Sequence, residues 1–236
     1  PIGISVTLGG TAVFGSSTTT LSLYARGCVS LLFFDACGGG TIATVTIPGS
    51  IFPELPPRLA TLDGGTLVLN VGDERSRRTV AKDTIAESYQ LTDLGGGKVM
   101  VDAFGYSETF EGVTSINGSF GSGNDSLSLT DGFAVPVFAV GGAGDDRMTS
   151  AGSGRVEFFG GDGKDTLIGG SGADTLNGES GSDYLEGGSG ADRIDGGVGD
   201  DMVFGGVLEL TSDTVVGGGD NDMFELRGTD GADVIT

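Results

Sequence analysis

Apolar and polar positions alternate in short runs along the first half of the chain, and Gly-rich or polar breaks separate the runs. Residues 1–47 contain "ISVTL", "TTLSLYA", "VSLLFF" and "TIATVTI", which are rich in β-branched and aromatic residues. Further runs follow at "GTLVLNVG", "DTIAESYQL", "GKVMVDAFG" and "SETFEGV". Such runs are typical of short strands, and no long stretch has a 3.6-residue apolar period. The pattern predicts an all-β chain.

From about residue 118 the pattern becomes a nine-residue unit, which is strictest over residues 160–204. Each unit has an Asp, an apolar residue two positions later and, in eight of nine units, a Gly two positions earlier. The nine aspartates are Asp125, Asp146, Asp165, Asp174, Asp183, Asp192, Asp201, Asp222 and Asp233. Two weaker units are also present, one with Asp213 but no glycines and one with Val156 at the Asp position.

The composition of the unit suggests a metal-binding loop followed by a strand. Glycines tolerate positive φ, so the loop can curl tightly and turn its carbonyl groups inward. The Asp adds a charged oxygen, and an oxygen-only ligand set is the one that calcium favours. The apolar residue two positions later points into the interior of a short strand. One unit cannot bury that residue alone, so the units are expected to stack.

Two units make a coil of 18 residues, which places successive loops on opposite edges of the stack. Asp165, Asp183 and Asp201 are then expected on one edge, and Asp174 and Asp192 on the other. Each calcium ion would lie between loops one coil apart, and we expect several ions, roughly six, in agreement with calcium's preference for carboxylate and carbonyl oxygens.

The charge of the chain is unevenly distributed and agrees with a cation partner. Residues 1–82 contain six basic and five acidic residues, whereas residues 83–236 contain six basic and 28 acidic residues. This acidity argues against nucleic acid as a partner, because phosphates would be repelled. No apolar run is long enough for a membrane span.

The pattern G-G-x-G-x-D-x-U-x resembles the RTX family of bacterial calcium-binding proteins. The resemblance is most specific over 160–204, extends over 118–236 and is absent over 1–60. It implies a right-handed parallel β-roll, or RTX β-solenoid, preceded here by an irregular or antiparallel β segment. It also implies export from a bacterium, so we expect a secreted, extracellular or cell-surface location.

The resemblance further implies which backbone and side-chain groups complete the calcium sites. Loop carbonyls are expected from the first glycine of each unit: Gly160, Gly169, Gly178, Gly187 and Gly196. Residues at the third position of the unit are included as candidate ligands: Asp162, Ser171, Ser180 and Ser189. Asp213 is included for the unit that lacks glycines.

We expect four segments along the chain. They are an N-terminal β segment (1–47), a Pro-rich connector (48–60), a β module leading into the solenoid (61–117) and the calcium-binding β-roll (118–236). Residues 61–118 resemble modules of very large calcium-binding bacterial surface proteins. The sequence opens on Pro1 and its last residues, "GTDGADVIT", begin a new unit, so we expect the chain to be an internal piece of a longer protein. Cys28 and Cys37 form either a disulfide or two buried thiols, because spacing alone does not decide between them.

Two further segments have alternative interpretations. The basic segment "DERSRRTVAK" (73–82) is either a solvated loop or a contact with an acidic coil or another copy of the chain. The apolar segment "FAVPVFAV" (133–140) is either an exposed adhesive surface or the strand of a half-coil without a calcium loop.

The candidate functions are structural rather than enzymatic. The chain has no His, which excludes Ser-His-Asp triads and H-E-x-x-H zinc sites. The sequence favours a calcium-stiffened module of a large secreted or surface protein, such as a stalk, surface-layer, filament or matrix element. The alternatives are the repeat portion of a secreted hydrolase or epimerase, or an adhesin segment, whose active or binding domain lies outside this chain. Other copies of the chain or neighbouring modules are the further candidate partners.

Overall fold

The computed structural model describes the backbone of residues 13–14, 18–31, 34–48, 58–71, 86–207, 213–227 and 234–235, and the side chains of residues 58–71, 86–204 and 213–225. These residues contain strands and turns but no helix, so the predicted all-β class is confirmed. None of them belongs to a helix long and apolar enough to cross a membrane. The chain divides into two compact units, Pro1–Leu55 and Pro56–Thr236. The basic segment 73–82 lies outside the described residues.

The first unit is built on a long antiparallel hairpin. Strand β2 (Thr18–Leu31) pairs with β3 (Phe34–Pro48), and the short β1 (Val13–Phe14) pairs with β2. The register places Cys28 opposite Cys37. Their side chains lie outside the described residues, so the disulfide stays a prediction.

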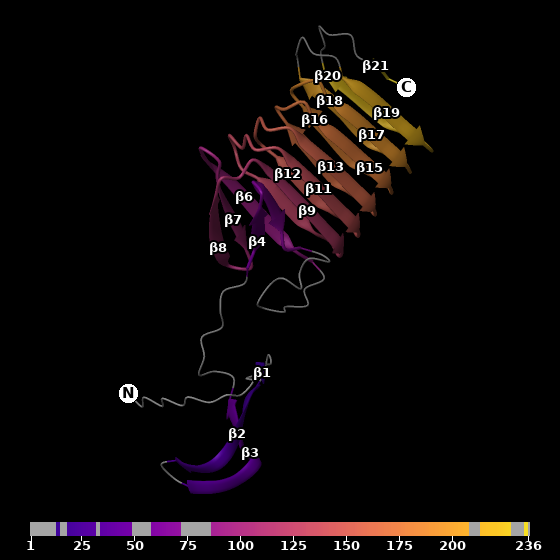
Figure 1. The fold of residues 1–236 in the computed structure, drawn as a ribbon. Helices are drawn as coiled ribbons and strands as arrows, with labels where there is room; N and C mark the ends of the chain where they lie inside the picture. The colour runs from indigo at the N-terminus through magenta and orange to yellow at the C-terminus, as the bar shows by residue number, and fades with distance from the viewer. Residues whose placement is uncertain are drawn as a thin grey trace. The chain divides into compact units, whose positions relative to one another are not determined.

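The second unit consists of two nine-stranded sheets whose strands alternate along the chain, as Figure 1 shows. Sheet I has the order β20-β18-β16-β14-β12-β10-β6-β7-β8, and sheet II has the order β21-β19-β17-β15-β13-β11-β9-β5-β4. From β9 onward the chain crosses from one sheet to the other with each strand. The strands of sheet I from this part are β10 (Ser126–Leu129), β12 (Arg147–Ser150), β14 (Thr166–Gly170), β16 (Tyr184–Gly188), β18 (Met202–Val207) and β20 (Met223–Arg227). Those of sheet II are β9 (Ser115–Ser122), β11 (Val137–Ala143), β13 (Val156–Asp162), β15 (Thr175–Ser180), β17 (Arg193–Val198), β19 (Thr214–Gly219) and β21 (Val234–Ile235).

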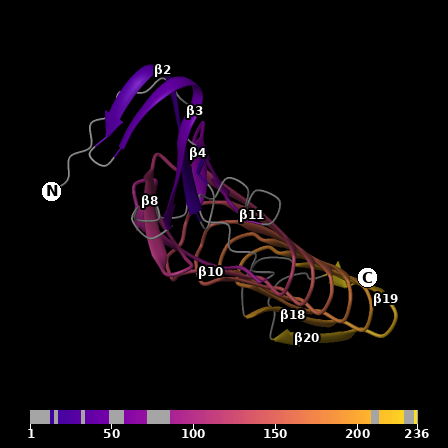
Figure 2. The same cartoon turned by 90° about the horizontal axis from the view of Figure 1, so that it is seen from below.

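Each coil lies on the next in parallel register, as the nine-residue period predicts. Leu167 is paired with Leu185 in sheet I, and Leu176 with Ile194 in sheet II. All four side chains are fully buried, whereas their neighbours in the strand face outward and are partly exposed. In Figure 2 the coils follow one another along the stack. The parallel β-solenoid expected of the repeats is therefore present.

The two sheets continue into residues 58–71 and 86–111, where antiparallel hairpins replace the coils. Strand β6 (Ser88–Gly95) pairs in parallel with β10 and in antiparallel with β7 (Lys98–Ala103), which pairs with β8 (Tyr106–Glu111). On the other side β5 (Thr66–Leu69) pairs with β9 and with β4 (Ala60–Asp63). The turn between β7 and β8 has positive φ at both central residues, Phe104 and Gly105, the conformation that matches strand twist in two-residue hairpins.

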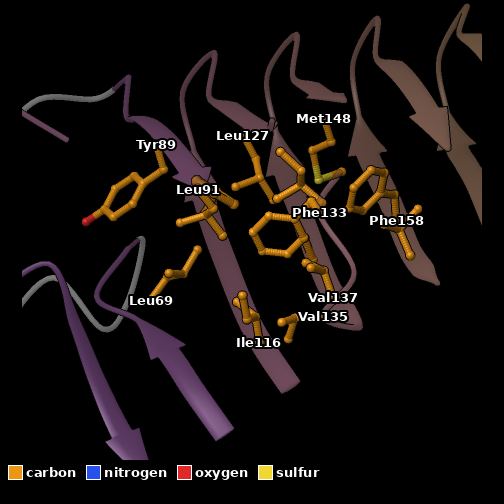
Figure 3. Close-up of a cluster of buried hydrophobic side chains, with 14 of the residues drawn as sticks. Leu69, Tyr89, Leu91, Ile116, Leu127, Phe133, Val135, Val137, Met148 and Phe158 are labelled. Carbon is orange, nitrogen blue, oxygen red and sulfur yellow. The ribbon is translucent and has the colours of Figure 1, made fainter. Parts of the chain in front are cut away.

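The apolar core is largest at this N-terminal end of the second unit. Figure 3 shows Tyr89, Leu91, Leu127 and Phe133 pointing into the space between the two sheets. The ring of Tyr89 meets two other rings edge-on, and its hydroxyl donates to Asn70 O over 3.2 Å. Four side chains of the segment 133–140, those of Phe133, Val135, Val137 and Ala139, lie in this core and are at most 8% exposed. The side chains between them face outward, and Phe138 is 40% exposed. Residues 137–140 belong to β11, the strand of a half-coil.

Candidate metal centres

The loops that enter sheet I each place one acidic residue directly before the strand, and these residues form a column along one edge of the solenoid. We call it the first column; it consists of Glu87, Asp125, Asp146, Asp165, Asp183, Asp201 and Asp222. In each neighbouring pair, the backbone N–H of the earlier residue donates to Oδ1 of the later Asp, over 2.6–3.2 Å. The aspartates thus join adjacent coils.

The loops that enter sheet II form a second column on the opposite edge. By register it consists of Leu67, Ile116, Val137, Val156, Asp174, Asp192 and Asp213. Here the N–H groups of Val156, Asp174 and Asp192 donate to Oδ1 of the next Asp over 2.7–2.9 Å. The two edges divide the aspartates as the 18-residue coil predicts, but the second column is acidic only from Asp174 onward.

In six of these carboxylates the other oxygen has no hydrogen-bond partner in the protein. The six residues whose Oδ2 is buried and accepts no hydrogen bond are Asp125, Asp146, Asp165, Asp174, Asp183 and Asp201. These side chains are only 2–3% exposed. Burying a carboxylate oxygen without a hydrogen-bond donor opposes folding. A row of such atoms therefore indicates that a bound cation compensates their charge.

The first glycine of each unit keeps open the space in front of that oxygen. A Cβ built on Gly160 would lie less than 3.0 Å from Asp165 Oδ2 and from the carbonyl oxygen of Gly178, one coil later. The same pairing of a carboxylate oxygen with a carbonyl oxygen from the next coil recurs at Gly141, Gly169, Gly178 and Gly196. The carbonyl oxygens of Gly160, Gly178, Gly187 and Gly196 thus lie close to these carboxylates, and their role as calcium ligands stays a prediction.

The burial of these carboxylates changes their acidity. Desolvation raises the pKa of Asp125, Asp146, Asp165 and Asp174 to about 6 and that of Asp183 to about 7. The pKa of Asp201 is also raised, chiefly by burial. Hydrogen bonds from the backbone act in the opposite direction, while neighbouring carboxylates in the first column reinforce the rise. The arrangement disfavours the charged form unless a cation compensates it.

The donor set suits a hard cation held between coils. Among the described residues, no three Asp, Glu, Cys or His side chains come together closely enough to hold a metal ion by themselves. The five gaps beside Gly141, Gly160, Gly169, Gly178 and Gly196 instead offer a carboxylate oxygen together with a glycine carbonyl. Oxygen-only sets of this kind fit Ca²⁺, which takes six to eight oxygen ligands with flexible geometry.

The residues at the third position of each unit contribute backbone hydrogen bonds to the loops, and their side chains do not fill the gaps between coils. Asp162, Ser171 and Ser180 have exposed side chains, and Ser189 is partly exposed. The carbonyls of Asp162 and Ser180 accept from Gly144 N and Gly163 N over 2.8 Å. Asp233 lies outside the described residues.

One residue of the first column, Glu87, and the residue at a glycine position beside this column, Phe120, were not predicted from the sequence. Glu87 occupies the position of the repeat Asp: it is 3% exposed, its N–H donates to Asp125 Oδ1, and its carbonyl accepts from Ser126 N. Phe120 stands where the corresponding coils have Gly141 and Gly160, and it is 2% exposed. The acid two positions before the apolar Tyr89 was the available signal for Glu87.

Comparison with known families agrees with this geometry. The model of the RTX calcium-binding nonapeptide repeat, which spans four copies, matches residues 159–193 and again residues 177–207. The chain carries RTX calcium-binding repeats. Comparison with curated proteins and with solved structures gave no match.

The RTX match covers only part of the two columns. It includes the five consecutive units of Asp165, Asp174, Asp183, Asp192 and Asp201. The structure continues the same hydrogen-bonded columns through less regular coils in both directions. The central section of the solenoid thus consists of RTX calcium-binding repeats, and the hydrogen-bonded columns extend beyond it in both directions.

Proposed function

We propose that this RTX solenoid is a structural module of a large secreted or cell-surface bacterial protein, and that extracellular calcium folds and stiffens it. The observation that carries the proposal is the row of buried Oδ2 atoms without a donor. Five of them, all but that of Asp125, lie near a carbonyl oxygen of the next coil, so an ion in the gap would hold two coils together. The module would serve as a stalk, surface-layer, filament or matrix element.

Calcium binding and folding are coupled in this proposal. Residues 83–236 carry 28 acidic and six basic residues, and self-repulsion opposes their compaction when no cation is present. A site that exists only in the folded chain contributes its binding free energy to folding. Millimolar calcium, the range typical of extracellular modules, is then the condition in which the repeat coils are ordered.

The proposal assigns no catalysis to the chain. It is supported by the absence of His from the sequence and by the use of the aligned carboxylates in bonds between coils. A carboxylate that holds two coils together is poorly placed to exchange protons with a substrate.

The test is a calcium titration of the chain in chelator-treated buffer, followed by far-UV circular dichroism and isothermal titration calorimetry. We expect β structure to increase with calcium at about millimolar concentration, with several ions bound. Magnesium at the same concentration is the control, because its stricter octahedral geometry fits loop carbonyls poorly. A spectrum in excess chelator identical to that in calcium, with no heat of binding, would show that the proposal is wrong.

A further inference from the structure

The second column changes its chemistry along the solenoid. In four neighbouring strands of sheet II, β5, β9, β11 and β13, the position is held by Leu67, Ile116, Val137 and Val156, which are 0–3% exposed. We call these four residues the apolar column. From the next coil the same position is held by Asp174, Asp192 and Asp213. On this edge, coils that meet through side-chain packing are followed by coils that meet through carboxylates.

The buried composition changes at the same place. Among the described residues, 22 buried apolar side chains lie at 59–158 and six at 167–215. The buried acids number three in the first range (Glu87, Asp125 and Asp146) and six in the second. Burial of apolar area stabilises without a ligand, whereas each buried carboxylate opposes folding until it is compensated. The first range therefore has an excess of ligand-independent stabilisation, and the second does not.

The N-terminal end of the second unit is also stabilised by contacts that need no metal. Leu59 N donates to Glu108 Oε2 over 3.0 Å, and Val113 N donates to Gly97 O over 2.8 Å. Phe120, at the position where later coils leave an open glycine, has its ring 6.1 Å from that of Tyr89.

We infer that residues 58–158 form a metal-independent folding nucleus, on which the coils of residues 160–225 assemble in N- to C-terminal order as calcium binds. This inference rests on the proposed function for its second half only. A solenoid coil has no core of its own, so it gains stability only from a neighbour that is already folded. The nucleus supplies that neighbour, because β12 and β13 present ordered strand edges to β14 and β15.

The experiment is hydrogen–deuterium exchange of the full chain at neutral pH, read by mass spectrometry peptide by peptide, in EDTA and in millimolar calcium. We expect peptides within 86–158 to exchange about 100-fold more slowly than unstructured peptides in both conditions. Peptides within 160–204 should reach comparable protection only with calcium.

The outcomes separate the two proposals. Loss of protection over 86–158 in EDTA, or protection of 160–204 at a lower calcium concentration than 86–158, overturns the nucleus. If the protection of 160–204 does not respond to calcium, the proposed function is wrong. The exchange of 86–158 in EDTA still decides whether the nucleus exists.

Two variants test the assigned cause. Val137→Asp places a charge in the apolar column; it should remove the protection of 86–158 in EDTA and raise the calcium midpoint of 160–204 about tenfold, as loss of a coupled neighbour does. Gln90→Asp adds the same charge at an exposed position of β6 and should change neither. Unaltered exchange in Val137→Asp overturns the inference.

The second variant, Asp192→Asn, tests the inference even if Val137→Asp does not fold. Asp192→Asn removes a carboxylate from the second column outside the nucleus, so it should weaken the calcium response of 160–204. It should leave the exchange of 86–158 in EDTA unchanged. Loss of that protection in Asp192→Asn would show that the two ranges fold as one unit and would overturn the nucleus.

Discussion

At the scale of the residue, each repeat Asp has two separate roles. Asp183 Oδ1 accepts from Asp165 N over 2.8 Å, while its Oδ2 is buried without a donor. We predict that Asp183→Ala costs about 1.5–3 kcal/mol in calcium, the value of a hydrogen bond to a charged group, and that it weakens the sites in both adjacent gaps. Asp183→Asn keeps an acceptor for Asp165 N and should lose mainly calcium affinity. Calorimetric titration and thermal melts of the two variants separate the two roles.

The control for this prediction must be an acidic residue that makes no hydrogen bond between coils. Asp131 is exposed in the turn after β10 and lies outside both columns, so Asp131→Ala should leave the calcium titration unchanged. Asp93 is less suitable although it also lies outside the repeats, because its Oδ2 accepts from Ala134 N over 3.1 Å. Equal titration curves for the Asp183 and Asp131 variants would contradict the stacked-loop sites.

At the scale of the element, the loop before β13 is the one regular-looking unit without an Asp. It has Val156 at the Asp position and Ala151 where other units have their first glycine. Arg155 lies beside it and pairs with Glu157 over 2.9 Å on the outer surface. A calcium ion between this loop and that of Asp174 would lack one carboxylate.

We therefore predict that Val156→Asp adds or strengthens one calcium site on the second edge. Phe158 still supplies the inward apolar side chain, so β13 should persist in calcium. The same variant should be less stable in chelator, because it places an uncompensated charge at a buried position. Calorimetric stoichiometry is the measurement, and Asn177→Asp, which adds the same charge on the outward side of β15, is the control. A strong anomalous calcium peak at this gap in the unmodified chain would contradict the prediction.

The elements differ in how far the sequence could predict them. The strict period placed the units of Asp165 to Asp201 on two edges, because an 18-residue coil fixes which loops are neighbours. The apolar column was not predicted, since Leu67, Ile116 and Val137 come from strands at unequal spacings and no period relates them. The incorporation of residues 60–111 into both sheets was likewise hidden, because β5 and β6 pair with strands far along the chain. Such register is set by tertiary packing rather than by local pattern.

At the scale of the whole molecule, the raised pKa values give metal-free and calcium-bound states opposite responses to acid. For Asp165 and Asp183 the folded pKa values are about 6 and about 7, against an ordinary Asp value of 3.8. A carboxyl whose pKa is raised by folding stabilises the fold below its unfolded pKa, and this contribution is lost as the pH rises through the folded pKa. Without metal, the solenoid should thus be more stable in mild acid than at neutral pH. Calcium reverses the order, because it requires the deprotonated carboxylates.

The corresponding prediction concerns the chain in EDTA and in calcium at about pH 5 and about pH 7.5, on either side of the raised pKa values. In EDTA, the lower pH should increase the β signal and slow the exchange of residues 160–204, since protonation removes the charge that burial disfavours. In calcium, the lower pH should shift the titration midpoint to higher concentration, because protons compete with the ion. Residues 86–158 contain fewer buried acids and should respond less. Higher stability in EDTA at pH 7.5 than at pH 5 would show that these carboxylates are compensated by something other than calcium.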